Sequence, residues 1–124
     1  MNLPENLQYT KEHEWVRIEG NTAVIGITAY AQDQLGDIVY VDIPTVGQEV
    51  AANEIFGTVE AVKTVSDLFM PITGTVTAFN EVLNTNPDFV NADPYGKGWM
   101  IKVNISGDHS QLLSQAEYAK LIGA

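Results

Sequence analysis

The chain has 124 residues, of which 45% are hydrophobic and 18% charged, so we expect one folded domain over residues 1–124 rather than a disordered chain or two independent cores. Its net charge of -10 would be repelled by a nucleic-acid backbone or an anionic membrane, which argues against both as main partners. Because cysteine is absent, disulfides, thiolate metal ligands and a cysteine nucleophile are excluded.

The N-terminal stretch MNLPENLQYTKEHEW has neither the basic and apolar regions of a signal peptide nor the arginine-rich character of a transit peptide. No apolar run approaches the roughly 20 residues that a membrane-spanning helix needs. We therefore expect a cytoplasmic protein of bacterial type, with a mature mitochondrial matrix form as the alternative. His13 and His109 have no histidine at a familiar ligand spacing and predict no metal site.

Alternating and β-branched runs bounded by turn residues dominate the first hundred residues, which predicts a mainly β fold. The predicted strands fall within residues 15–20, 22–28, 37–44, 54–62 and 74–79. Gly20 and Asn21 both tolerate positive φ and predict a hairpin turn between the first two strands.

Short helices are predicted at three places. Thr28 is a good N-cap for a helix over residues 29–35, and Gly36 stands where a C-terminal glycine is expected. The pairs Asp108 with Gln111 and Ser114 with Glu117 both resemble capping boxes, so two further short helices should close the chain. Residues 84–98 contain two prolines and two glycines and predict a long irregular loop.

A short repeat lies in the middle of the chain. GTVEAV at residues 57–62 recurs as GTVTAF at residues 74–79, with Ile55 and Ile72 two positions before the two glycines. The repeat indicates two similar strand units related by an approximate twofold, although chance could also produce a string that suits a strand. Alternation along the first unit places its core face at Ile55, Gly57, Val59 and Ala61.

Lys63 follows this first unit, in the stretch VKTVSD that we expect to form the turn between successive strands. Ser66 and Asp67 suit local hydrogen bonds in such a turn. The lysine would then project into solvent at the tip of a hairpin. From spacing alone, a surface lysine that is simply solvated or guards a sheet edge is the commoner case.

The segment EAVKTVSDLFMPITGTV at residues 60–76 resembles the swinging arm of the glycine cleavage system H-protein family, in which a lysine of a Glu-Ser-Val-Lys-Ala type motif carries lipoic acid as an amide. Three other stretches share the resemblance, EHEWV, GITAYAQDQLGDIVYVDIPTVG and VNADPYGKGWMIKV, in the expected order and over most of the chain. Glu60 and Val62 match the arm motif, whereas Ala61 and Thr64 replace the usual serine and alanine. The resemblance implies a lipoyl/biotinyl-carrier-like barrel-sandwich hybrid with short helices, including a C-terminal helical segment, and lipoate on Lys63.

The same resemblance implies a non-catalytic carrier whose arm serves three enzymes, since the redox chemistry belongs to the cofactor and the partners. A pyridoxal-phosphate-dependent glycine decarboxylase would load the arm with the aminomethyl group of glycine. A tetrahydrofolate-dependent aminomethyltransferase would unload it, and dihydrolipoamide dehydrogenase, with FAD and NAD, would reoxidise it. A lipoate ligase or lipoyl transferase would first attach the lipoate.

A protective cleft for the loaded arm is also implied, with Glu14 and Asp67 facing the cationic amine. Glu12 stands where the family often has serine, which adds charge to this cleft. His13 is expected to pack or cap locally, and Trp15 and Trp99 are expected in the core or the cleft wall.

Several alternatives stay open. A lipoyl relay that hands its lipoate to other complexes would need the same lysine, and an unmodified β scaffold would not need it. A biotin carrier would have methionines at Val62 and Thr64, and a 2-oxoacid dehydrogenase lipoyl domain would be shorter and tethered by linkers. Lys97, flanked by glycines, is the one rival modification site. No pairing of a nucleophile with a base in the sequence indicates an independent enzyme.

Overall fold

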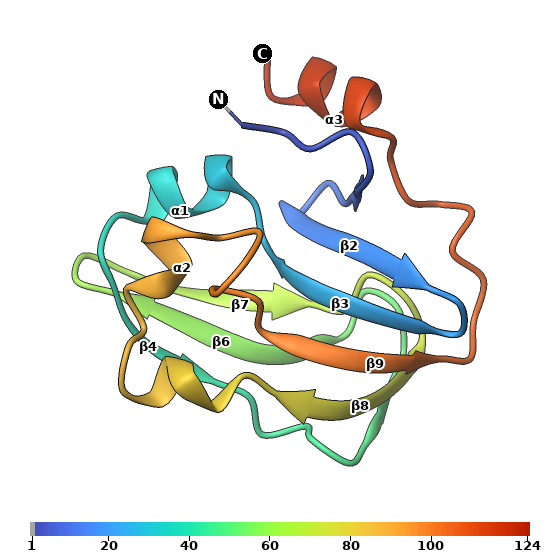
Figure 1. Cartoon of the computed structure of the whole chain (residues 1–124), viewed down its shortest axis with the longest axis horizontal. Coiled ribbons are helices and arrows are strands. Elements are labelled where there is room, and N and C mark those ends of the chain that lie inside the picture. Colours follow the sequence, from blue (N-terminus) through green and yellow to red (C-terminus); the bar gives the residue numbers. More distant parts are fainter. Residues whose placement is uncertain (1) are drawn as a thin grey trace.

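Two antiparallel sheets form most of the protein, as a computed structural model of the chain shows for residues 2–124 (Figure 1). The larger sheet has six strands in the order β1-β2-β3-β9-β8-β5. Its strands are β1 (Gln8–Tyr9), β2 (Glu14–Glu19), β3 (Thr22–Ile27), β5 (Glu49–Val50), β8 (Gly74–Phe79) and β9 (Ile101–Ile105). The expectation of a mainly β fold is confirmed.

The β2–β3 hairpin has the turn that the sequence predicts. Glu19 pairs with Thr22, which leaves Gly20 and Asn21 as a two-residue loop. Gly20 has φ 63, so the glycine supplies the positive φ that such a tight turn requires.

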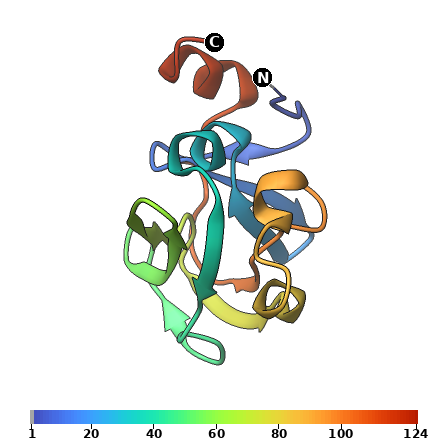
Figure 2. The ribbon, with the colours of Figure 1, turned by 90° about the vertical axis from the view of Figure 1, so that its left-hand side faces the viewer.

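The smaller sheet has the order β4-β6-β7, with β4 (Ile38–Asp42), β6 (Ile55–Ala61) and β7 (Val65–Phe69). Residues 62–64 connect β6 to β7 and form the loop at the left edge of Figure 1. In Figure 2 this end of the hairpin faces the viewer, below α1. The tip therefore lies at the surface, as the sequence predicts for the turn after the first repeat unit.

Helices α1 (Ala29–Leu35) and α3 (Gln115–Leu121) begin at the caps expected from the sequence. Thr28 accepts a hydrogen bond from the Ala31 amide, and Gly36 closes α1 with φ 80. Ser114 and Glu117 form a complete capping box at the start of α3. These two helices depend on local hydrogen bonds, which is why their ends can be read from the sequence.

The predicted helix after Asp108 is wrong. The Asp108 carboxylate accepts hydrogen bonds from the amide and hydroxyl of Ser110 and forms only a turn. Leu113 then exchanges two backbone hydrogen bonds with Tyr9, at 2.9 and 2.7 Å. Because Leu113 pairs with the end of β1, its amide and carbonyl are satisfied outside any helix.

The segment predicted as an irregular loop, residues 84–98, contains helical turns as well. The 3-10 helix η1 (Glu81–Asn84) leads into it, and α2 (Phe89–Ala92) buries Val90 in the core. Asn91 accepts from the Ile38 amide and donates to the Gly36 carbonyl, each at 2.9 Å. This short helix therefore fixes the connection between α1 and β4, which adjoins the hairpin tip.

The repeated glycines have a shared physical cause. A Cβ on Gly57 would lie 2.4 Å from the Asp42 carbonyl oxygen, and one on Gly74 would lie 2.4 Å from the Asn104 carbonyl oxygen. In each repeat unit, the backbone of the neighbouring strand approaches too closely for any side chain. The two units belong to different sheets, β6 to the smaller and β8 to the larger.

One residue of the predicted core face of β6 is misplaced. Ile55 is 48% exposed, whereas Phe56 is buried. The pairing of β6 with β7 shifts register between Ile55 and Gly57, so the alternation of faces is broken there. Gly57, Val59 and Ala61 lie on the buried face as expected.

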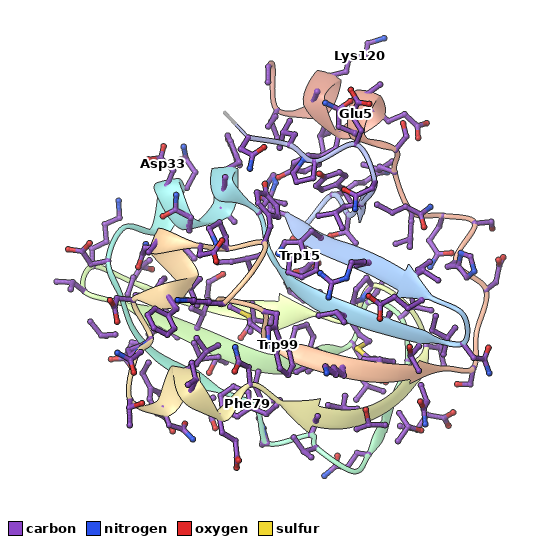
Figure 3. All side chains as sticks on the ribbon, in the orientation of Figure 1. Glu5, Trp15, Asp33, Phe79, Trp99 and Lys120 are labelled. Atoms are coloured by element: carbon purple, nitrogen blue, oxygen red, sulfur yellow. The ribbon has the colours of Figure 1, made fainter. Side chains whose placement is uncertain are left out.

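The core consists of a main cluster with residues from both sheets and a second cluster rich in aromatic side chains. Trp15 is fully buried in the second cluster, and its indole donates a 2.9 Å hydrogen bond to the Pro94 carbonyl. Trp99 packs against the same cluster. Figure 3 shows Trp15 beside β2 and β3 and Trp99 beside β9, which agrees with the expected core role.

Gly57→Ala should destabilise the protein by about 2–3 kcal/mol, because the added methyl group forces β4 and β6 apart. Urea unfolding monitored by tryptophan fluorescence would measure the change. Thr58→Ala, on the same strand, controls for a general weakening of β6. Equal losses in the two variants would show that the close approach at Gly57 has no special cost.

Candidate functional site

The hairpin tip is held by its backbone and leaves its side chains free. The Ala61 amide donates to the Thr64 carbonyl at 2.7 Å, and the Val62 amide donates to the Asp37 carbonyl at 3.0 Å. Val62 is 77% exposed, and Lys63 and Thr64 are also exposed. The turn is therefore a rigid support for a solvent-exposed lysine.

Ser66 and Asp67 do not belong to this turn, contrary to the expectation from sequence. Both lie in β7, where Ser66 pairs with Val59 and Asp67 with Thr58. The turn is shorter than expected because β7 begins at Val65 and continues the ladder with β6. Ser66 and Asp67 thus line the cleft beside the hairpin instead of closing its tip.

Lys63 extends over the C-terminal end of α1. A Cβ placed on Gly36 would lie 3.6 Å from Lys63 Cε and 4.0 Å from its Nζ. Asn91 holds Gly36 and Ile38 from the other side, as described above. The position of the lysine is thus set by three segments that are distant in sequence, the hairpin, the end of α1 and α2.

A cleft of about 260 Å³ runs between α1 and the β6–β7 hairpin, and we call it the arm cleft. It is lined by Glu12, His13, Glu14, Ile27, Tyr30, Ala31, Gln34, Leu35, Val59, Ser66, Asp67 and Leu68. Lys63 lies at the Leu35 end, next to Gly36. Its floor is apolar, with Ile27, Val59 and Leu68 all buried. Glu14, Asp67 and Glu12 all line it, so the structure brings together the carboxylates singled out in the sequence.

Glu14 is the buried acidic group of the cleft, with only 2% of its surface exposed. Its carboxylate accepts a 2.6 Å hydrogen bond from the Thr10 hydroxyl and a 3.3 Å bond from the Phe69 amide. Burial raises the pKa of Glu14 to about 8, and these two hydrogen bonds oppose the rise only in part. Within residues 2–124, the one ion pair joins Arg17 and Glu19, so Glu14 has no cationic partner there.

His13 packs against the cleft and contributes no obvious proton chemistry. Its Nδ1 lies 2.8 Å from the Tyr118 hydroxyl, and its ring packs on Tyr30 with centroids 4.9 Å apart. Burial lowers the pKa of His13, and the nearby Glu12 carboxylate counteracts this only in part. The ring is therefore neutral near pH 7, which agrees with the expected packing role.

Lys97, the rival modification site, lies in a different setting. Its ammonium is over the Phe89 ring, 5.6 Å from the centroid, and its amide donates to the Asp93 carboxylate. It follows α2 in a turn region and does not lie at a strand hairpin. The structure therefore gives Lys97 an intramolecular contact that Lys63 lacks.

Several residues of the site were missed by sequence reasoning, among them Tyr30, Gln34 and Tyr118. Tyr30 and Gln34 line the cleft from α1, and Tyr118 reaches it from α3 through His13. The helix containing Tyr30 was predicted, but nothing in its sequence shows which side faces the hairpin. Tyr118 carries no local signal, because its partner is 105 residues away.

Two further findings concern the described residues. Over residues 2–124, no group of three or more His, Asp or Glu side chains is arranged to hold a metal ion. In the same part of the chain, no helix is both long and apolar enough to cross a membrane.

Comparison with known proteins gives consistent matches over nearly the whole chain. A sequence model of the glycine cleavage H-protein family matches residues 7–124. The glycine cleavage system H protein of Bacteroides thetaiotaomicron is 62% identical over 103 residues, or 83% of this chain and 82% of that protein. That of Geobacillus kaustophilus is 56% identical over 124 residues, or 98% of each chain.

The crystal structure of a glycine cleavage system H protein from Mycobacterium marinum is also similar. It superposes with a TM-score of 0.91 at 38% identity, covering 98% of this chain and 99% of that one. The likeness confirms the expected lipoyl-carrier-like barrel-sandwich fold.

The raised pKa of Glu14 makes folding stability depend on pH. Above pH 4.5, the ordinary pKa of the group, the Glu14 carboxyl ionises in the unfolded chain but stays protonated in the folded protein until about pH 8. The stability that the group contributes at low pH is therefore lost as pH rises through about 8. Glu14→Gln keeps a neutral group and should remove this loss, which is about 5 kcal/mol between pH 4 and pH 9.

Urea unfolding across this pH range would measure the difference between the wild type and Glu14→Gln. Glu5→Gln, at an exposed position, controls for the loss of one negative charge. If the free energy of unfolding of the wild type and of Glu14→Gln changed with pH in the same way, the raised pKa of Glu14 would be contradicted.

Proposed function

The chain belongs to the glycine cleavage H-protein family of lipoyl carriers, and from this premise we propose that Lys63 is the residue that carries the lipoate. The carrier role in the glycine cleavage system follows from membership of the family. The position of Lys63 supports this assignment. The lysine lies at an exposed hairpin tip, which backbone hydrogen bonds hold in place and which adjoins a cleft. An attaching enzyme can reach an amine in this position without unfolding any strand.

Three of the other lysines suit the role less well. Lys97 and Lys102 lie over the rings of Phe89 and Trp99, so both ammonium groups are engaged by aromatic faces. Lys120 is in the last turn of α3, where its charge favours the helix end. Lys63 has no such partner among the described residues, apart from its packing beside Gly36.

The arm cleft fits a long apolar chain with a polar or cationic end. Its floor of Ile27, Val59 and Leu68 can bury methylene groups, and its far end carries the Glu14 carboxyl. Glu14 accepts from Phe69, at the far end of β7 from the turn. Val65 and Phe69 are four residue steps apart along an extended strand, which is roughly 14 Å. An acylated lysine is long enough to fold back over this distance, whereas a free lysine is not.

When lipoate is bound, its dithiolane supplies the redox and group-carrying chemistry, which no side chain of a cysteine-free protein offers. The residues of the cleft would exclude water from the arm and hold its charged end. A cationic group beside Glu14 favours the ionised carboxylate, so docking would shift a proton away from Glu14. Asp67 and Glu12, which are exposed, add negative charge to the lining of the cleft.

The partner cycle follows as part of the same proposal. The arm on Lys63 takes the aminomethyl group of glycine from the pyridoxal-phosphate-dependent decarboxylase and delivers it to the tetrahydrofolate-dependent aminomethyltransferase. Dihydrolipoamide dehydrogenase then reoxidises the arm, and a lipoate ligase or lipoyl transferase attaches it at the outset. Residues 1–124 act as a single carrier domain, and tethering the cargo raises its concentration at each enzyme that the arm can reach.

Lys63→Arg should abolish lipoylation, because arginine keeps the charge but offers no amine of comparable nucleophilicity. Intact mass measurement and peptide mapping after expression in lipoate-replete cells should place the lipoyl group on residue 63 of the wild type. Lys97→Arg, the matched control, should keep the added mass. A lipoyl group that remains in Lys63→Arg, or that is lost in Lys97→Arg, would overturn the assignment.

Asp67→Asn in the lipoylated protein should shorten the lifetime of the bound aminomethyl group by a few fold, because one of the carboxylates near the cationic end is removed. Asp42→Asn is the matched control. Asp42 in β4 and Asp67 in β7 pair with Thr58 from opposite sides of β6, and Asp42 does not line the cleft. The measurement is ammonia release after loading by the decarboxylase. Equal rates in both variants would remove Asp67 from the cleft's function.

A further inference from the structure

We infer that Tyr118, on the C-terminal helix, is a positioning residue that fixes His13, and with it residues 12–14 of the arm cleft, against the start of α1 through its hydroxyl group. The inference rests on the proposed role of the cleft as the shelter of the loaded arm. Tyr118 does not line the cleft itself, and it belongs to a helix that is far from Lys63 in sequence. Its effect on the arm would therefore pass through the residues that it contacts.

The Tyr118 hydroxyl joins two neighbouring segments beside the cleft, whose backbones also pair through the 3.0 Å hydrogen bond from the Thr28 amide to the His13 carbonyl. It lies 2.8 Å from His13 Nδ1, in the wall formed by residues 12–14. It also lies 2.8 Å from the Thr28 hydroxyl, which caps α1, the helix that lines one side of the cleft. The three groups form one connected chain of hydrogen bonds between His13 and the start of α1.

The direction of these hydrogen bonds follows from the available protons. Thr28 Oγ1 already accepts from the Ala31 amide, so the Thr28 hydroxyl proton is free to be donated to Tyr118. Tyr118 can then donate its own proton to Nδ1 of a neutral His13. In this arrangement both hydroxyl protons are used, and the His13 proton resides on Nε2.

His13 has an uncommon backbone conformation that its contacts hold in place. Its φ is 73, in the left-handed region that few residues other than glycine adopt, although histidine, asparagine and aspartate are enriched there. The backbone is tied to Thr10 and Thr28 by hydrogen bonds of 3.1 and 3.0 Å. The ring is held between Tyr30 and Tyr118. The next residue is Glu14, so any movement of His13 moves the buried end of the cleft.

The Tyr118 ring is itself firmly placed. It is fully buried, and it stacks on Tyr9 with centroids 4.8 Å apart and planes inclined by 7°. Its helix begins with the capping box of Ser114 and Glu117. Burial raises the pKa of Tyr118 to about 12, so the hydroxyl keeps its proton throughout the physiological range. A fixed ring and a permanent proton are what a residue that positions His13 requires.

The test uses the whole lipoylated chain, loaded with the aminomethyl group by the decarboxylase. In water the carbon–sulfur bond breaks, and the group leaves as formaldehyde and ammonia while the sulfur returns to a thiol. Tyr118→Phe should speed this release about five-fold, the loss expected from one hydrogen bond. Tyr9→Phe is the matched control, because its hydroxyl donates to the Pro4 carbonyl in the same aromatic cluster and does not reach the cleft.

A second readout separates positioning from stability. The 15N chemical shift of His13 Nδ1 should change in Tyr118→Phe, where this nitrogen loses its donor, and stay unchanged in Tyr9→Phe. His13→Asn, which tolerates the positive φ, removes the same contact from the other partner. The double variant His13→Asn with Tyr118→Phe should release the cargo no faster than His13→Asn alone.

Equal release rates in Tyr118→Phe and Tyr9→Phe would overturn the inference, and so would additive effects in the double variant. A different result would count against the proposed function itself. If the loaded wild type releases its cargo as fast as the same adduct of free dihydrolipoamide, the cleft gives no shelter. In that case the cleft role and this inference fall together, although lipoylation of Lys63 would stand on its own measurement.

Discussion

One buried carboxyl group joins the two sheets, and the arrangement of the cleft depends on it. Glu14 begins β2 in the larger sheet and accepts a hydrogen bond from the Phe69 amide at the end of β7 in the smaller sheet. A second bond comes from Thr10. A buried carboxyl group without a cationic partner costs stability, and its raised pKa reflects that cost. Such a group is retained more readily at a functional site than in an ordinary core, where an apolar residue would serve better.

The remaining parts of the cleft are held by side chains that come from distant segments. Asn91 of α2 binds both Gly36 and Ile38, which frame the connection beneath Lys63. Tyr118 of α3 contacts His13 and Thr28 at the opposite end. The helices, although short, therefore act as supports for a site carried by the strands. This division suits a carrier, because a mobile arm needs a rigid base from which to reach several partners.

The accuracy of the sequence interpretation depended on the range of the interactions involved. The caps of α1 and α3 were predicted correctly, since a cap and its helix are a few residues apart. The capping pattern at Asp108 was as plausible locally, but Leu113 pairs with Tyr9 and no helix forms. Ile55 was assigned to the core from alternation, and a register shift against β7 exposes it. In both cases a long-range backbone pairing overrode a sound local pattern.

Local chemistry was enough to identify the β-rich class, the hairpin at Gly20, the place of Lys63 after a strand and the resemblance to a carrier family, because each depends on neighbouring residues or on the order of motifs. The protein's three-dimensional packing decided that Lys63 lies beside Gly36, that Glu14 is buried at the far end of a cleft, and that a tyrosine near the C terminus braces it. These features arise between segments separated by tens of residues. Burial and its effect on a carboxyl pKa exist only once those segments have come together and excluded water.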